Sequence, residues 1–492
     1  MNDAVSLSHA TLDRLPAGVA RPRYDPAAIS TGIVHLGFGG FHRAHMARFT
    51  HDLMEARQDA SEWGIVGVGL MPADRRIRDA LTPQDGLYAL VERQDDDETV
   101  SIIGAVREVL FAGESTAQVL TTIDDPAVRI VSLTVTPHGY CLNAATRTLD
   151  FDHPAILHDL QQPAAPSSAI GIVVESYRRR RDAGLPAFTA LTCDNIPHNG
   201  DVLRDAVLAL AARRDPQLAD WITANAAFPN TMVDRITPLT TAEQIQDLET
   251  RLGVRDAAPV FCERFRQWVV EDAFVAGRPA WEAVGVQFTP DVAPYELMKL
   301  RLLNASHLAV AGLGRLCGLA FIDETMREPA LHAYMGALMD RETGPTLPPV
   351  PGVHLAAYKA QLLERFGNRR IKDTVDRVNA DAPVGLLLDP IRDRLAAGQS
   401  ADLLALAAWM RRQTGVDEAG QPISVVHPQA ELLRERALSG GPDPRALLGL
   451  HDIFGDLHAH DGFVATLQGW LEDLYTLGAR RTLKQARIRL AF

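Results

Sequence analysis

The sequence has little cysteine and no long apolar run, and both absences narrow the classes of protein to which it can belong. Its 492 residues include only four cysteines, which form no CxxC pair: Cys141, Cys193, Cys262 and Cys317. This spacing suggests neither a disulfide framework nor a thiolate zinc site, so we expect reduced thiols. No uninterrupted apolar stretch approaches the ~20 residues that span a bilayer. Residues 1–25 show no charged-then-apolar leader, and we therefore expect a cytoplasmic protein.

The chain also lacks an excess of positive charge, because its formal net charge at pH 7 is −13. Nucleic acid and anionic membrane surfaces both require a basic face, so neither is expected as a main partner. The one dense basic run, residues 178–181, is interpreted as the solvated end of a helix. With 47% hydrophobic and 23% charged residues, the composition is that of a soluble globular protein of two or three domains. We expect a small-molecule substrate and a monomer or small homo-oligomer.

What the sequence does contain is a change of pattern near residue 290. Helical spacing separates short β-rich runs at residues 32–40, 63–70, 128–136 and 188–195, which predicts a mainly parallel sheet. Residues 87–94 and 98–110 are predicted to form an antiparallel hairpin with the aspartates at 95–97 in its turn. The segments after residue 291 are long and helical. We expect an α/β domain over residues 1–290 and a mostly α-helical domain over residues 291–492.

The segment GFGGFHRAH at residues 37–45 follows the first predicted strand and opens a helix, as a dinucleotide-binding turn does. Gly37 and Gly39 allow a tight bend and a close approach to a pyrophosphate. His42 replaces the third glycine of the usual GxGxxG pattern, so the motif alone fits nucleotide binding and an ordinary glycine turn about equally. Arg43 is either a phosphate contact or a surface residue. The candidate cofactor-binding residues here are Gly37, Phe38, Gly39, Gly40, Phe41, His42 and Arg43.

A second candidate cofactor contact follows the second predicted strand, in the sequence GLMPADRR. Asp74 is the nearby carboxylate, and an acid at this place commonly binds the adenosine ribose of NAD. Arg75 and Arg76 follow it and could instead accept the 2′-phosphate of NADP. The pattern favours NAD and leaves NADP as the less favoured choice. The alternative role for Asp74 is to cap the helix that begins there.

The strongest indication of function is an apolar helical segment, residues 294–320, that carries Glu296, Lys299, Asn304 and His307. At 100° per residue these four side chains fall within roughly 140° of one another, and apolar side chains occupy the remaining circumference. A helix that is apolar on most sides is normally buried. Burying a lysine, an amide and an imidazole is costly unless they meet one another or a polar ligand, so this stripe is predicted to line a site.

Two further motifs are ambiguous when each is taken alone. CDN at residues 193–195 ends a predicted strand, where open α/β sheets place ligand contacts. An asparagine such as Asn195 is there more often a turn residue or a helix cap. FPNTMVDRITP at residues 228–238 contains an Asp-Arg pair, and such a pair is most often a structural ion pair.

Taken together in this order, GFGGFHRAH, CDN, TMVDRITP, QWVVEDAFVAGRP and PYELMKLRLLNASH resemble the long-chain polyol dehydrogenases, the mannitol dehydrogenase family. Within that family the resemblance is closest to the mannitol 2-dehydrogenases. It implies a Rossmann-type N-terminal domain, a mostly helical C-terminal domain, an active site in the cleft between them and NAD as cofactor. It also implies hydride transfer without a metal, that is, oxidation of a polyol such as mannitol or arabinitol to its ketose.

The resemblance assigns the catalytic lysine to Lys299, with Asn304 and His307 beside it on the helix. Burial depresses the pKa of a lysine, so a neutral amine could take the hydroxyl proton. Asn195 and Asn304 would donate to the oxygen as it gains charge. Glu296 would pass the proton to water or lie at the surface. Of the remaining matches, Asp234 is expected to border the substrate and Arg377 to contact its distal hydroxyls.

One departure from the family pattern affects the choice of substrate. After Arg377 the mannitol enzymes continue with a DGS stretch and a PK pair, whereas this chain has a shorter loop with Val384 near the place of that lysine. The shorter loop therefore supports mannitol as the substrate less strongly than the other motifs support the reaction type. A fructuronate or tagaturonate reductase of the same family is the first alternative, because TVTPHGYC at residues 134–141 resembles those enzymes. A non-catalytic sugar-binding relative is the second.

Overall fold

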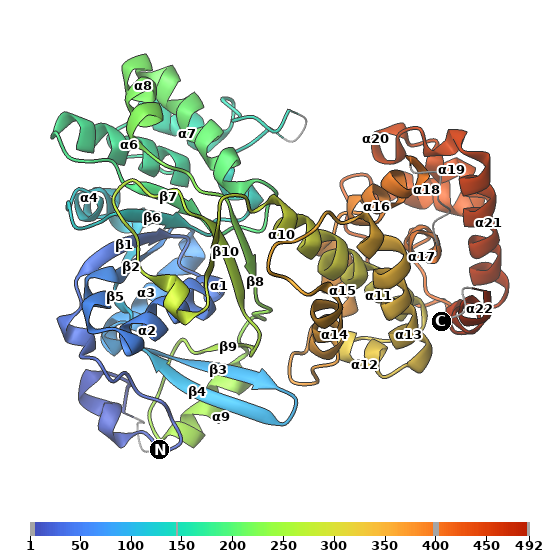
Figure 1. Ribbon diagram of the computed structural model, residues 1–492, viewed down its shortest axis with the longest axis horizontal. Coiled ribbons are helices and arrows are strands. Elements are labelled where there is room, and N and C mark those ends of the chain that lie inside the picture. Colours follow the sequence, from blue (N-terminus) through green and yellow to red (C-terminus); the bar gives the residue numbers. More distant parts are fainter. Residues whose placement is uncertain (1–4, 144–145, 397–402, 490–492) are drawn as a thin grey trace. The chain divides into compact units, whose positions relative to one another are not determined.

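The computed structural model describes residues 5–143, 146–396 and 403–489. The chain divides into two compact units, Met1–Val292 and Ala293–Phe492. Figure 1 shows the first unit in blue to yellow-green and the second in yellow to red.

A five-stranded sheet forms the centre of the N-terminal unit, in the order β5-β2-β1-β6-β7. These strands are β1 (Thr31–Leu36), β2 (Gly64–Gly69), β5 (Val106–Phe111), β6 (Ile130–Leu133) and β7 (Thr189–Thr192). All four pairings are parallel. The strand order reverses between β1 and β6, which is where open α/β sheets bind ligands beyond the carboxyl ends of their strands. The predicted Rossmann-type sheet is confirmed.

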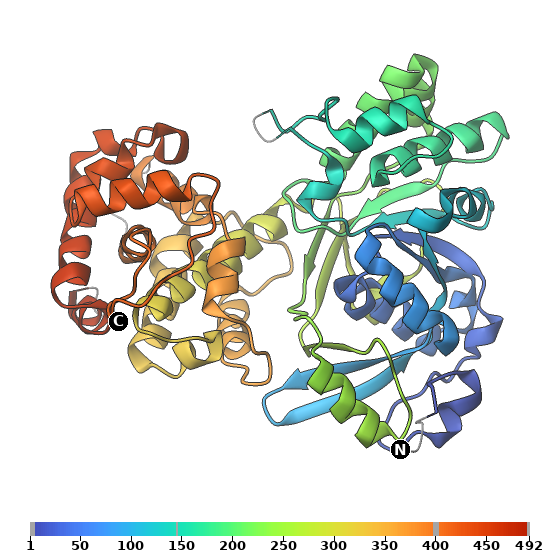
Figure 2. The same cartoon turned by 180° about the vertical axis from the view of Figure 1, so that it is seen from behind.

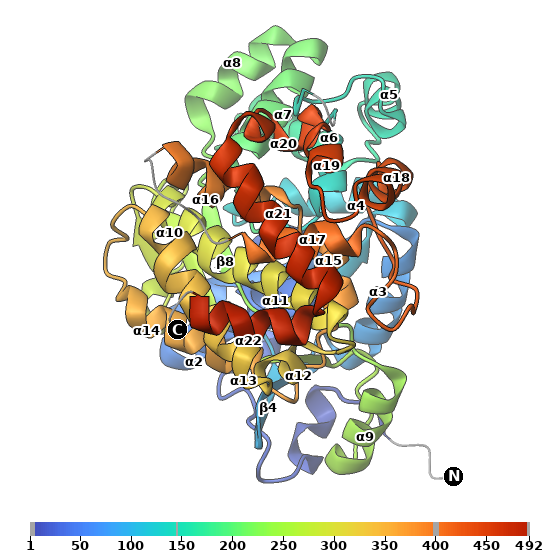
Figure 3. The same ribbon diagram turned by 90° about the vertical axis from the view of Figure 1, so that its right-hand side faces the viewer.

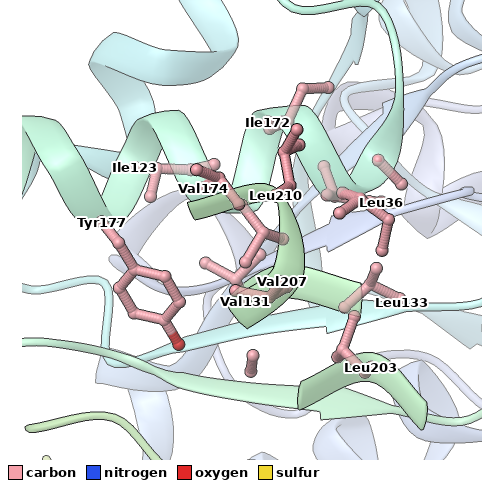
Figure 4. Close-up of a cluster of buried hydrophobic side chains, with 14 of the residues drawn as sticks. Leu36, Ile123, Val131, Leu133, Ile172, Val174, Tyr177, Leu203, Val207 and Leu210 are labelled. Carbon is pink, nitrogen blue, oxygen red and sulfur yellow. The ribbon is translucent and has the colours of Figure 1, made fainter. Parts of the chain in front are cut away.

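Helices cover both faces of this sheet, as Figures 1 and 2 show from opposite sides. One face packs against α4 (Ala112–Ile123), α6 (Ala169–Asp182) and α7 (Asn199–Arg214). Figure 4 shows this core, in which side chains such as Leu36 and Val131 from the sheet meet Val174 and Leu210 from the helices. The other face packs against α2 (Met46–Ala56). Cover on both faces explains why β1, β2, β6 and β7 are buried along their whole length and mostly apolar.

Two smaller sheets complete the unit, in the orders β4-β3-β9 and β11-β10-β8. Their strands are β3 (Tyr88–Gln94), β4 (Asp97–Ile103), β8 (Thr231–Asp234), β9 (Val260–Glu263), β10 (Gln267–Glu271) and β11 (Gln287–Thr289). The predicted hairpin of β3 and β4 is present, but its second strand was predicted too long. Strand β4 ends just before Gly104, where a Cβ would lie 3.0–3.2 Å from Pro26, Pro22 and Tyr24. The residues beyond it form β5, which joins the parallel sheet instead.

The other helices of the N-terminal unit are short or peripheral. They are α1 (Gly40–Ala44), α3 (Arg75–Leu81), α5 (Pro154–Gln161), α8 (Pro216–Asn225) and α9 (Ala242–Leu252), with 3-10 turns at His9–Arg14, Pro26–Ala28, Gln58–Trp63, Pro72–Asp74, Thr82–Gln84, Pro137–Tyr140 and Trp281–Val284. The arginine run at residues 178–181 lies at the end of α6. Three of its members form ion pairs with Glu175, Asp124 and Asp215. Arg180 is not solvated as expected, because it is buried and donates to the backbone carbonyls of Ile123 and Val128.

The C-terminal unit is built of helices around α11 (Ala305–Leu316), which contacts α12, α13, α15, α16 and α17. Figure 3 looks onto this unit, where α17 packs against both α11 and α21. Its other helices are α10 (Ala293–Met298), α12 (Ile322–Met326), α13 (Pro329–Leu338), α14 (Leu355–Phe366), α15 (Val375–Asp381), α16 (Gly385–Ala396), α17 (Leu404–Arg412), α18 (Ala430–Gly440), α19 (Arg445–Leu448), α20 (His451–Phe454), α21 (Asp461–Thr476) and α22 (Ala479–Arg489), with π turns at Lys299–Asn304 and Met339–Thr343 and 3-10 turns at Gly344–Thr346 and Leu457–Ala459. No helix in the described parts of the chain combines the length and the apolar character needed to cross a membrane.

Candidate active site

The glycine turn lies at the carboxyl end of β1, beside the end of β6. Gly37 has φ +86°, and a Cβ on it would lie 2.2 Å from the carbonyl oxygen of Thr134, so this position requires glycine. The Thr134 hydroxyl donates to the Gly37 carbonyl at 2.9 Å and ties the two strand ends together. Gly39 differs, because the nearest atom to a Cβ there is 3.8 Å away. The turn is therefore rigid at Gly37 and open at Gly39, which fits the close approach of a dinucleotide phosphate.

Aromatic packing explains how the turn dispenses with the third glycine of the usual motif. His42 is buried, and its ring stacks on that of His35 with the ring centroids 3.5 Å apart. His35 in turn bonds the hydroxyls of Ser132 and Thr134, each at 2.8 Å. Burial lowers the pKa of His35 to about 3 and that of His42 well below its ordinary value, so both rings are neutral near pH 7. The His42 side chain thus packs between helix and sheet where the usual motif needs a glycine.

The helix after the turn is broken, and Arg43 points into the protein. The chain leaves helical geometry at His45, which separates α1 from α2. Arg43 is buried, donates to the Ala258 carbonyl and lies 5.3 Å from the ring centroid of Tyr88. Phe41 stacks on His45 with a centroid distance of 5.0 Å. The alternative that Arg43 is a surface residue is therefore wrong, because its side chain is buried among contacts within the N-terminal unit.

Asp74 lies just beyond the end of β2, beside the glycine turn of β1 in the sheet order. Its Oδ2 accepts from the backbone N–H groups of Leu70 at 3.0 Å and Met71 at 2.9 Å. The carboxylate thus closes the turn that follows β2, and it makes no side-chain cap on α3. The guanidinium of Arg75 lies 5.3 Å from the ring centroid of Phe111. This is the place in the fold where a ribose-binding carboxylate is expected.

Asn195 follows β7 and is exposed, and its neighbours are held firmly. Asp194 is buried and accepts from the backbone N–H groups of Val135 at 3.0 Å and Thr136 at 2.8 Å. Asn199 donates to the carbonyls of Asp194 and Thr231, each at 2.9 Å, and so ties the end of β7 to the start of β8. Neither Asp194 nor Asn199 was predicted from the sequence. The position of Asp194 beside Asn195 in CDN was the available signal.

Asp234 is the last residue of β8, and its side chain is buried. Its neighbour Arg235 is also buried, pairs with Glu92 and donates to the carbonyls of Glu263 and Ala44. The two residues of the Asp-Arg pair therefore differ in role. Arg235 is a structural residue held by contacts within the N-terminal unit, and Asp234 lies at a strand end.

In the C-terminal unit, the helix that carries Lys299 differs from the expected uninterrupted α-helix. A π turn occupies Lys299–Asn304 between α10 and α11, and the N–H of Ala305 bonds the carbonyl of Leu300, five residues earlier. A turn closed over five residues stacks Lys299 and Asn304 on the same side of the helix axis. The expectation from ideal α geometry, that the four polar side chains fall within roughly 140° of one another, did not include this π turn. The π turn brings the lysine and the amide closer in angle than an α-helix would.

The polar side chains of this helix are largely buried. Lys299 is 7% exposed and His307 is 9% exposed. Asn304 is half-buried, and its Oδ1 makes no hydrogen bond within the described residues. Glu296 is half-buried on α10, one turn before the lysine. A buried amide oxygen without a partner costs free energy, so this position is suited to a polar ligand.

Arg377 and His307 meet the same carboxylate, which the sequence analysis did not single out. Arg377 donates to Asp373 from Nε and Nη2, and Nη1 bonds Asp381 at 2.8 Å. The Nε2 atom of His307 lies 3.5 Å from Oδ2 of Asp373. The four-residue spacing of Asp373 and Arg377 in DTVDR was the signal that could have indicated this pair. Val384 is buried in the loop before α16.

The predicted residues thus fall into two groups. The glycine turn, Asp74, Asn195 and Asp234 belong to the N-terminal unit, whereas Lys299, Asn304, His307 and Arg377 belong to the C-terminal unit. Within the described residues, no group of three His, Cys, Asp or Glu side chains is placed to hold a metal ion.

Comparison with known proteins decides the family. The family model described as "Mannitol dehydrogenase Rossmann domain" matches residues 31–283, and the model described as "Mannitol dehydrogenase C-terminal domain" matches residues 291–475. The chain belongs to the mannitol dehydrogenase family. The recognition made from the sequence motifs is therefore confirmed, as is the expectation of an NAD-dependent oxidoreductase of the mannitol 2-dehydrogenase type.

Relatives within the mannitol dehydrogenase family align over nearly the whole chain. The D-mannonate oxidoreductase of Escherichia coli is 46% identical and covers 94% of this chain and 97% of the relative. A mannitol 2-dehydrogenase of Phaeosphaeria nodorum is 40% identical, covering 95% of this chain and 83% of the relative. The structure of Pseudomonas fluorescens mannitol 2-dehydrogenase, a ternary complex with NAD and D-mannitol, is 42% identical with a TM-score of 0.86, covering 98% of this chain and 99% of that chain.

Proposed function

We propose that this protein oxidises a secondary hydroxyl of an acyclic polyol, such as mannitol or arabinitol, to a ketone, with Lys299 as the general base. The observation that carries the proposal is the π turn, which places a buried lysine and an amide with an unpartnered oxygen on one side of a helix. The match to a mannitol 2-dehydrogenase complexed with NAD and D-mannitol supports it.

NAD, when bound, accepts the hydride. We assign NAD binding to the domain of residues 1–290, where Gly37, Gly39 and the turn up to Arg43 would receive the pyrophosphate. Asp74 would receive the adenosine ribose. The open space at Gly39 and the position of Asp74 after β2 support this assignment. The domain of residues 291–492 carries the base.

In the proposed reaction, the Lys299 amine removes the hydroxyl proton. Burial favours the neutral form of an amine, and that form can act as a base. The amides of Asn195 and Asn304 donate to the substrate oxygen as negative charge develops on it. Glu296 carries the proton onward to water. In ketone reduction the protonated lysine returns it.

The remaining polar side chains would fix the substrate. His307 holds a hydroxyl near the reacting carbon, Arg377 contacts the distal hydroxyls and Asp234 borders the chain of the polyol. With the shorter loop that contains Val384, fewer polar groups recognise one end of the substrate. We therefore expect weaker discrimination among polyols than a longer polar loop would give.

A second function, reduction of a hexuronate such as fructuronate or tagaturonate, is favoured by one observation. The segment before Asp373 carries three cations, Arg369, Arg370 and Lys372. The Lys372 side chain is 57% exposed, with its amine 3.6 Å from Oδ2 of the buried Asp323. A substrate carboxylate would need such a cation. The 46% identity to a D-mannonate oxidoreductase points the same way.

A substrate panel tests both functions. NADH formation would be followed with mannitol, arabinitol and sorbitol, and NADH consumption with fructose, fructuronate and tagaturonate. The polyol proposal predicts the highest kcat/KM for a polyol and its ketose. A preference for the hexuronates would replace it with the second function, and no NAD-linked turnover with any compound would contradict both.

We further propose a cytoplasmic enzyme that is a monomer or a small homo-oligomer. The four cysteines are all free thiols, which suits a reducing compartment. Light scattering of the purified protein measures the mass directly, and a mass above that of a small oligomer would contradict this assignment.

A further inference from the structure

A single buried carboxylate, that of Asp373, lies between two side chains that we propose to contact the substrate. Its Oδ2 is 3.5 Å from Nε2 of His307 on α11. On its other side, Arg377 on α15 donates from Nε to Oδ1 at 2.6 Å and from Nη2 to Oδ2 at 2.5 Å. The side chain of Asp373 is 5% exposed, whereas that of Asp381, the other carboxylate bonded to Arg377, is 62% exposed. Burial makes the contacts of Asp373 the stronger ones.

The backbone holds this carboxylate in place. The carbonyl of Asp373 accepts from the N–H of Ile322 at 3.0 Å, and the N–H of Val375 donates to the carbonyl of Ala320 at 3.0 Å. Phe321 and Thr374 form an antiparallel bridge between these two bonds. Asp373 therefore belongs to a short paired segment that is attached just after α11, the helix that carries His307.

The contacts of Asp373 have two chemical consequences. His307 Nε2 and Oδ2 of Asp373 are at ion-pair distance and do not form a hydrogen bond. The negative charge of the carboxylate beside Nε2 favours the ring form of His307 that carries a proton there. Phe366 stacks on the imidazole with a centroid distance of 4.8 Å and sets the plane of the ring. The paired bonds from Arg377 fix the plane of its guanidinium.

We propose that Asp373 is a positioning residue that orients His307 and Arg377 together for binding and turnover of the substrate. The proposal rests on the proposed function for the roles of those two side chains. It predicts that one carboxylate controls both the geometry at the reacting carbon, through His307, and the contact with distal hydroxyls, through Arg377. Asp373 itself touches no substrate in this account.

The test is Asp373→Asn, which keeps the shape of the side chain and removes its charge. Changes of this kind behind a metal-ligating histidine typically cost about 10- to 100-fold, and we expect a loss of the same order for a substrate-binding histidine. We expect kcat to fall at least tenfold and KM to rise, with an unchanged dissociation constant for NAD. The melting temperature should also fall, because Arg377 loses a buried ionic partner. Asp373→Glu should recover part of the loss. Wild-type kcat and KM in Asp373→Asn would overturn the proposal, as would a loss that is accompanied by equally weakened NAD binding.

Two matched controls separate the contributions. Asp381→Asn removes only the exposed partner of Arg377, so we expect a KM rise of less than about threefold with kcat unchanged, as for an exposed ion pair. Asp376→Asn, on the same helix, removes a partner of Arg315 and should leave both parameters as in the wild type. A kcat loss in Asp381→Asn as large as that in Asp373→Asn would contradict the special role of the buried carboxylate.

The protonation of His307 can be measured without substrate, so the role of Asp373 can be tested independently of the proposed function. Nitrogen NMR of the wild-type protein with labelled histidine reports which ring nitrogen of His307 carries the proton. A proton on Nε2 supports the inference even if Asp373→Asn does not fold or if no polyol is turned over. An unprotonated Nε2 near neutral pH overturns it, whatever the substrate panel gives.

Discussion

The two units build their parts of the candidate site in different ways. In the N-terminal unit, backbone geometry shapes the glycine turn, because Gly37 has a positive φ and Gly39 leaves open space. Neutral buried histidines pack beneath this turn. In the C-terminal unit, side chains form the candidate site. A π turn at Lys299–Asn304 and the buried carboxylate of Asp373 position them. Substitutions in the first unit should therefore alter stability and cofactor affinity, and those in the second should alter the rate.

The largest effect is expected at the base. In Lys299→Met, kcat should fall by about 10²- to 10⁴-fold, because proton removal loses its catalyst. The dissociation constant for NAD, measured by quenching of protein fluorescence, should stay within a factor of about two, because the cofactor is assigned to the other unit. Retention of wild-type kcat would remove Lys299 from the mechanism.

The next effect is expected at Asn304. Asn304→Ala should lower kcat by about 10²- to 10³-fold, the usual loss for one donor to a developing oxyanion. Since its Oδ1 makes no hydrogen bond within the described residues, stability should hardly change. Steady-state kinetics and thermal unfolding of the same preparation check both statements. A large drop in melting temperature with little change in kcat would assign Asn304 to the structure instead.

Two glycine variants distinguish a glycine that the backbone requires from a glycine assigned to cofactor binding. Gly37→Ala should destabilise the protein by about 1–3 kcal/mol, because alanine is strained at positive φ and its Cβ would meet the Thr134 carbonyl. Gly39→Ala, where a Cβ has room, should fold normally and weaken NAD binding about tenfold or more. Chemical unfolding and NAD titration distinguish the two. Equal effects of both variants on stability would contradict the assignment of Gly39 to the cofactor.

For a single side chain, the smallest effect concerns pH. Burial lowers the pKa of His35, His45 and His51 in the N-terminal unit to about 3. The unfolded chain then binds more protons below its pKa of about 6.5, so the stabilisation is complete above that pH and declines as pH falls. Each histidine should cost about 1.4 kcal/mol per pH unit below 6.5. Hydrogen exchange at pH 7 and pH 5.5 should therefore show a larger loss of protection in β1 than in α11, and an equal loss in both would refute this expectation.

How much was predictable from the sequence depends on whether the signal is local in the chain. The glycine turn, the parallel sheet and the stripe with Lys299 were predicted, because strand and helix periodicity and strand-turn-helix order are local features. A further local signal was available: the chain has only four lysines, and none precedes Lys299. The π turn was missed because its extra residue per turn leaves no periodic mark in a short segment. Asp373 was missed because its approach to His307 depends on a backbone bridge between Phe321 and Thr374.

The central claim, that an amine at position 299 takes the hydroxyl proton, is tested most directly by chemical rescue of Lys299→Ala. Small primary amines added to this variant with NAD and the best polyol of the panel should restore NADH formation, in proportion to the concentration of the neutral amine. Rescue that increases with amine basicity is the predicted result. If no amine restores turnover to a folded variant that still binds NAD, or if buffers of any kind restore it equally, the claim is contradicted.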